Sequence, residues 1–132
     1  MKKSVVLSLF MLFTAVAFAQ NKVASKMDSW AELKSFHTVM SQTFHPSEDG
    51  NLQPIKERAG EMLEAAIALH KSQTPADLDK AKMSDATLRL ATQCKFLVGM
   101  VVEKKSDEDI TKQLAAAHNV FHEIAGMCNE KH

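Results

Sequence analysis

The sequence predicts an all-α protein: an antiparallel, up-down-up-down four-helix bundle that follows an N-terminal signal peptide. The first observation is composition, since the 132 residues include 7 Phe, 1 Trp and no Tyr, whereas strands are built mainly from aromatic and β-branched residues. The second is periodicity, because four segments repeat apolar residues at steps of three and four, with short polar breaks between them. Short connections place neighbouring helices antiparallel.

The first two helices are predicted at Trp30–Phe44 and Leu52–Lys71. Ser29 with Glu32 three residues later has the pattern of a capping box. The segment 45–51 contains Pro46 and Gly50 and should end the first helix, since neither residue continues a helix cheaply. We assign Glu48 and Asp49 to this break as loop charges.

The third and fourth helices are predicted from capping signals as well. Thr74-Pro75-Ala76-Asp77 offers a cap, a proline at the first helical position and an acid after it. The third helix should end near Lys104. Ser106, followed by the acidic run 107–109, should start the fourth helix, which reaches about Asn129.

The N-terminus has the features of a secretory signal peptide at residues 1–19. Lys2 and Lys3 precede an apolar stretch, and Ala17-Phe18-Ala19 supplies small residues before a cleavage site at Gln20. A short segment, 20–28, then leads into the bundle, 29–132. No second long apolar run follows, so we expect a periplasmic or secreted protein with no stable membrane insertion after cleavage.

Charge and motifs exclude several functions. Lys plus Arg and Asp plus Glu are both 16, so a strongly basic nucleic-acid binder is not expected. No nucleophile elbow, phosphate-binding glycine loop or dinucleotide fingerprint occurs. His118 and His122 lack the internal Glu that zinc proteases use as general base. We therefore expect no enzyme.

The candidate functional residues are histidines and sulfur-containing side chains at one level of the bundle. Reflecting the helices about their loops places five of them within about one helical turn, or ~5 Å: His37, Met40, Cys94, His118 and His122. Imidazole suits zinc, copper and haem iron, and sulfur ligands favour copper or zinc. The sequence predicts a copper or zinc site held by His37, His118 and His122, with Met40 and Cys94 as variable ligands.

Handedness decides what the pair His118 and His122 faces. With one handedness it faces His37 and Met40 on the first helix, and with the other it faces the third helix and Cys94. The alternative to a site is an ordinary bundle in which His37 is a hydrogen-bonded core residue and Met40 fills a gap. His45 is expected to cap or decorate the loop, with an accessory ligand role as the lesser alternative.

The two cysteines are not expected to pair with each other. Cys128 lies about 18 Å along the fourth helix from the level of Cys94, and a disulfide needs Cα atoms within ~7 Å. Cys128 falls near His70 and Met83, which makes His70 and Cys128 a weaker second site. Because Cys128 lies near the C-terminus, it can also pair between chains, so a homodimer stays open.

At these residues the chain resembles, in architecture, the small exported four-helix-bundle cytochromes. Soluble b-type members ligate haem through a Met of the first helix and a His of the last, which correspond to Met40 and to His118 or His122. The resemblance implies a non-covalent haem b protein for electron transfer. The c-prime class uses Cys-x-x-Cys-His, and the segment 128–132 lacks the second Cys, which excludes covalent attachment.

A second resemblance is to small exported, His-rich bundle proteins of Bacteroidota. It is carried by Phe36-His37, by Thr43-Phe44-His45-Pro46 and by His118 with Phe121-His122, and it implies no mechanism. Three functions therefore stay open: periplasmic sequestration or delivery of copper or zinc, haem b electron transfer, and a metal-free envelope chaperone or adaptor. The sequence names no protein partner.

Overall fold

The computed structural model describes residues 26–130. All of the regular secondary structure in this part of the chain is α-helix. Helix makes up 83% of the described residues, and no strand occurs among them. The all-α prediction is therefore confirmed. The predicted signal peptide and His132 lie outside the described residues. The helices are α1 (Lys26–Ser29), α2 (Ala31–Glu48), α3 (Gln53–Lys71), α4 (Lys80–Val102) and α5 (Asp107–Asn129).

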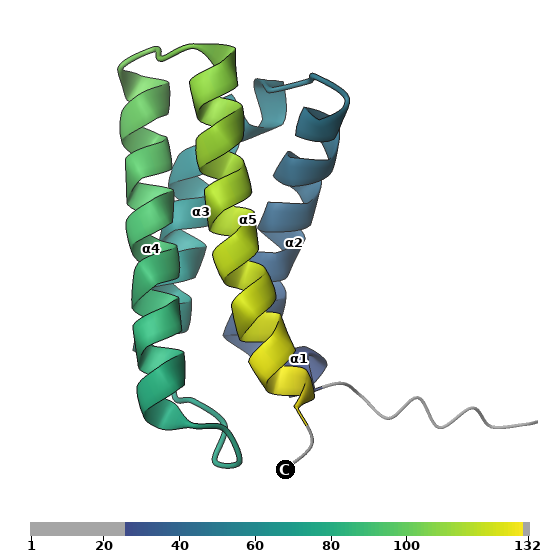
Figure 1. The fold of residues 1–132 in the computed structure, drawn as a ribbon, viewed down its shortest axis with the longest axis vertical. Coiled ribbons are helices and arrows are strands. Elements are labelled where there is room, and N and C mark those ends of the chain that lie inside the picture. Colours follow the sequence, from purple (N-terminus) through teal and green to yellow (C-terminus); the bar gives the residue numbers. More distant parts are fainter. Residues whose placement is uncertain (1–25, 131–132) are drawn as a thin grey trace, which may run out of the picture.

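The four longer helices lie side by side, and the short α1 lies at the end of the molecule where α5 finishes (Figure 1). Helices that follow one another from α2 to α5 pack together, and α5 also contacts α2. Helices α2 and α5 pack less closely against each other than the other neighbouring pairs of long helices do. The looser packing between these two helices leaves a pocket, which is lined by histidines among other residues.

Helix α2 differs from its prediction at both ends. Ser29 belongs to α1, where its Oγ donates to the carbonyl of Lys26 at 2.8 Å, and Trp30 takes the N-cap position without a side-chain cap. The capping-box prediction was therefore wrong. Pro46 lies inside the last turn, and the chain leaves the helix only before Gly50, whose φ of 80° suits glycine. The helix consequently includes His45 and Glu48.

Helix α4 starts later than predicted, whereas α5 starts as predicted. Residues after Pro75 form a turn closed by the Leu78 N–H on the Pro75 carbonyl at 3.0 Å. Asp79 is the N-cap, and its carboxylate accepts from the N–H groups of Ala81 and Lys82. The predicted start at Thr74–Asp77 was wrong because the cap and proline signals form this turn instead. Ser106 caps α5 by accepting from the Asp109 N–H.

The buried core follows the predicted stripes, with corrections at two histidines and at Phe44, which is half-buried. His37 is exposed and His70 is only half-buried, while Phe36 and Leu69, one position earlier, are buried. The inward faces of α4 and α5 are those predicted, apart from Val101, which is half-buried. Cys94 on α4 and Cys128 on α5 are both buried, and neither forms a disulfide within the described residues.

Within residues 26–130, none of the helices combines the length and the apolar character needed to cross a bilayer.

Candidate metal-binding pocket

A pocket of about 250 Å³ lies between α2 and α5. Its walls are imidazole, aromatic and sulfur-containing side chains together with one carboxylate and one hydroxyl. The lining residues are His37, Met40, Ser41, Phe44, His45, Glu48, His118, Phe121 and His122. Of the two faces that handedness left open, the structure selects the one toward α2.

His118 and His122 form the centre of this pocket. They stand one turn apart on α5, and their Nε2 atoms lie 3.2 Å apart. Their rings are nearly perpendicular, at 88°, with centroids 4.4 Å apart. A hydrogen bond between two imidazole nitrogens requires one N–H and one lone pair. One of the two Nε2 atoms therefore carries the shared proton, and the other accepts it.

Stacked aromatic rings orient two histidines of the pocket, His118 and His37. Phe44 stacks on His118 with centroids 3.7 Å apart and planes at 8°. His37 stacks on Phe121 with centroids 5.2 Å apart and planes at 10°. Phe121 is itself buried in the core. The planes of two of the pocket histidines are thus set by packing, which reduces the freedom that a ligand must lose on binding.

His45 and Glu48 form a second pair at the rim of the pocket, on the last turn of α2. His45 Nδ1 lies 3.1 Å from Glu48 Oε2, and both side chains are exposed. A carboxylate only accepts hydrogen bonds, so Nδ1 of His45 carries the proton. Glu48 keeps its second oxygen, Oε1, for another partner.

The pocket lowers the pKa of His118 below its ordinary value. Partial burial disfavours the charged imidazolium most, and the nearby His122 adds repulsion. Glu48 acts in the opposite direction, while His45 and His37 add smaller lowering effects. His118 therefore favours the neutral imidazole, which is the form that can ligate a metal.

Four of the five residues predicted for the principal site come together here: His37, Met40, His118 and His122. Met40 is only 1% exposed, so its thioether lies at the inner wall. Within residues 26–130, no three His, Cys, Asp or Glu side chains are yet arranged around one ion position.

Cys94, the fifth predicted residue, does not line the pocket. It is fully buried on α4, and burial raises the pKa of its thiol to about 12. A cysteine ligand must be a thiolate, and this environment disfavours that form.

The sequence did not suggest Glu48 as a site residue, and it gave His45 only a lesser role. Both were assigned to a break that Pro46 was expected to cause. Pro46 lies inside α2, and the helix continues past it to Glu48. The spacing of three between His45 and Glu48 is informative only once this segment is helical.

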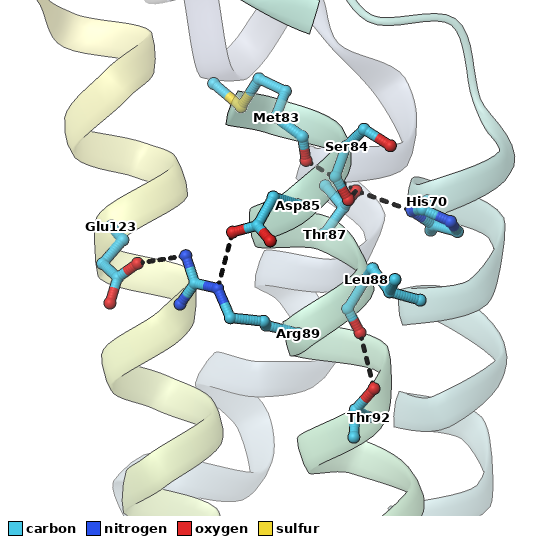
Figure 2. Close-up of polar contacts among 9 residues, drawn as sticks. All are labelled: His70, Met83, Ser84, Asp85, Thr87, Leu88, Arg89, Thr92 and Glu123. Atoms are coloured by element: carbon cyan, nitrogen blue, oxygen red, sulfur yellow. Dashed lines mark hydrogen bonds and ion pairs between the residues drawn. The ribbon is translucent and has the colours of Figure 1, made fainter. Parts of the chain in front are cut away.

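The weaker second site is not assembled in the same way. His70 Nδ1 lies 2.9 Å from Thr87 Oγ1 (Figure 2). The Thr87 hydroxyl donates to the Met83 carbonyl at 2.8 Å, so it accepts from His70. Cys128 is buried on α5, and burial raises the pKa of its thiol, with Lys26 and Asp77 as the charges acting on it. His70 thus has a structural partner in Thr87, on α4.

Charged contacts tie α4 to α5 beside this region. Arg89 donates through Nε to Asp85 at 3.0 Å, and through Nη2 to Glu123 on α5 at 2.8 Å (Figure 2). These two carboxylates raise the pKa of the guanidinium. Exposed bridges of this kind contribute little stability each, and this one directs Glu123 toward α4 (Figure 2).

No family model, curated protein or solved structure matches the chain. The chemistry of the pocket is therefore the basis for assigning a function.

Proposed function

We propose that this protein binds a copper or zinc ion in the pocket between α2 and α5, and that it sequesters or delivers the ion without catalysis. The observation that carries the proposal is the 3.2 Å separation of the His118 and His122 Nε2 atoms. Two nitrogen ligands, each about 2.0–2.1 Å from a tetrahedral zinc ion, lie about 3.3–3.4 Å apart. The two imidazoles are already spaced as such a pair, so an ion can replace the proton between them.

Side chains of α2 supply the remaining candidates. His37 and Met40 line the same pocket. Imidazole accepts either zinc or copper, and a thioether favours copper(I). Cys94 fits less well, because its buried thiol has a raised pKa.

We also propose that the chain is an exported protein of the periplasm and folds as an antiparallel four-helix bundle after signal cleavage. The packing of each long helix against the next supports this topology, as do the connections at 49–52, 72–79 and 103–106, which are short for helices of this length.

The size of the pocket favours an ion over haem. Pockets for small organic ligands have volumes of about 300–1,000 Å³, and this one has about 250 Å³. Haem ligated by Met40 and His118 or His122 would also require the buried Met40 and the stacked Phe44 to move.

A metal-free adaptor is the second candidate, and a feature of α4 favours it. Leu88, Phe96 and Val102 are exposed on this helix at 53%, 58% and 75%. Exposed apolar side chains on one helix are consistent with a protein partner. On this alternative the histidines respond to pH and bind no metal.

Elemental analysis with an absorption spectrum separates these functions. The protein is purified from a periplasm without affinity metals. Near-stoichiometric copper or zinc without a Soret band is the expected result. A Soret band would replace it with the haem function, and a colourless protein that also ignores added metal would support the adaptor.

A further inference from the structure

The pocket between α2 and α5 also contains one carboxylate, that of Glu48. Resting on the proposed function, we propose that Glu48 is the third ligand, and that the ion is divalent zinc. His118 Nε2, His122 Nε2 and Glu48 Oε1 hold the zinc ion, and His45 is a positioning residue that holds the carboxylate through Oε2.

The position of Glu48 at the rim of the pocket supports its assignment as a ligand. Glu48 is the last residue of α2 and lines the pocket with both α5 histidines. Its Oε2 already accepts from His45 Nδ1 at 3.1 Å, which leaves Oε1 as the unassigned oxygen. A hydrogen-bond donor on one carboxylate oxygen orients the other toward a metal, as outer partners commonly do at metal sites.

The negative charge of Glu48 also supports its assignment as a ligand of a divalent cation. Glu48 is the only acidic residue among those lining the pocket, where four imidazoles already gather. A dication held by neutral imidazoles alone leaves both charges uncompensated, whereas one carboxylate offsets half of them. Glu48 also favours a positive charge on His118, whereas His122, His45 and His37 disfavour it.

The ligand set then selects the ion. Two imidazoles and one carboxylate, with a fourth position open to water, form a common zinc set. Copper(I) prefers thiolate and thioether ligands over a carboxylate oxygen. The only sulfur atom in the pocket lining belongs to Met40, which lies at the inner wall rather than at the rim with Glu48.

Assembly of this site requires side-chain motion, because no three such groups surround one ion position within residues 26–130. His118 and His122 already converge, and the Glu48 side chain is 56% exposed, so it can rotate about its own bonds without disturbing the core. Zinc binding displaces the proton shared by the two imidazoles and places Oε1 on the ion.

Titration calorimetry with zinc sulfate tests the proposal on four forms of the protein: wild type, Glu48→Gln, His45→Gln and Asp49→Asn. Glu48→Gln keeps the shape of the side chain and removes its charge. Asp49→Asn removes the same charge one residue away and outside the pocket lining. We expect affinity to fall by ~100-fold or more for Glu48→Gln and by ~10-fold for His45→Gln, the range seen for ligand-shell changes, with Asp49→Asn unchanged.

Thermal melts without zinc confirm that each variant is folded, since all three substitutions are at exposed positions. Equal zinc affinity in wild type and Glu48→Gln would overturn the assignment of Glu48 and leave the proposed function intact. Binding of copper(I) under a reductant, with none of zinc, would likewise overturn only the zinc assignment. A wild-type protein that binds neither ion would overturn both proposals.

Discussion

The imidazoles of His118 and His122 meet at Nε2, 3.2 Å apart and one helical turn apart on α5. Among the described residues 26–130, this is the only hydrogen bond between two histidine nitrogens. Because packing of Phe44 on His118 holds one ring in place, this pair is prepared for a ligand before any ligand arrives.

The first prediction concerns stability. A metal ion that binds only the folded protein should stabilise it by ~2.7 kcal/mol at 100 times its dissociation constant. Replacing both His118 and His122 by alanine should abolish this gain, while the metal-free protein keeps its helical circular dichroism. Urea denaturation with and without metal measures the effect.

His70→Ala serves as the control, because His70 bonds to Thr87 away from the pocket. That variant should lose stability with and without metal, but keep the full gain from the ion. If the double variant gained as much as wild type, the ion would be bound elsewhere.

The second prediction concerns pH. The folded protein lowers the pKa of His118, so the unfolded chain binds this proton more readily, at an ordinary pKa of about 6.5. The stabilising contribution is present above that value and is lost as the pH falls through the lowered pKa of the folded state. Urea denaturation between pH 7.5 and pH 5 should show this loss, and His118→Gln should make the curve flatter.

Metal affinity should fall over the same range, since protons compete for the imidazole lone pairs. A pH dependence of stability that is unchanged in His118→Gln would mean that another group is responsible. NMR titration of the histidine ring protons would then identify that group.

The sequence predicted the class of fold and most of the core because apolar periodicity reports directly which face of a helix is inward. The prediction of helix boundaries failed where the same local residues can either bound a helix or lie in another structure. Pro46 was interpreted as a stop, yet it lies in the last turn of α2; the Thr74–Asp77 pattern was interpreted as a helix start, yet it forms a turn before Asp79. Packing between helices decides such cases.

The site was predictable in part for the same reason. The spacing of His118 and His122 places them on one face of a helix whatever the tertiary structure, so their pairing follows from sequence. Their partner helix does not, because it depends on the handedness of the packing. Glu48 entered the pocket only because α2 continues past Pro46.

The third prediction concerns thiol reactivity. Burial raises the pKa of Cys94 to about 12 and also raises that of Cys128. At pH 8 only about one Cys94 thiol in 10⁴ is then ionised, and the thiolate is the reactive form. Ellman's reagent should therefore modify neither cysteine rapidly in the folded protein, and both in denaturant. Fast native labelling would place a thiol at the surface.

A substitution at the buried Cys94 distinguishes a packing role from a role as a metal ligand. Cys94→Ala should lower the free energy of unfolding by about 1 kcal/mol, because it removes a buried sulfur atom from the core. Metal affinity should stay unchanged, since Cys94 does not line the pocket. A loss of affinity in a variant that is still folded would return Cys94 to the ligand set.

The fourth prediction concerns the joint between the start of α2 and the end of α3. The buried Trp30 indole donates from Nε1 to Ser72 Oγ at 2.9 Å, and Ser72 donates in turn to the Leu69 carbonyl at 2.7 Å. Ser72→Ala removes the acceptor and leaves a part-buried N–H without this partner, which should cost about 1–2 kcal/mol of unfolding free energy. Ser84→Ala, at an exposed site on α4, is the control.

Trp30 is the only tryptophan in the chain, so its fluorescence reports on this joint alone. Ser72→Ala should shift the emission of the folded protein, while the pocket between α2 and α5 keeps its metal affinity because neither residue lines it. If stability and emission were both unchanged, the indole would be bonded to water instead of Ser72. If metal affinity also fell, the start of α2 would be coupled to its histidine-bearing turns, and the pocket would depend on how the whole helix is seated.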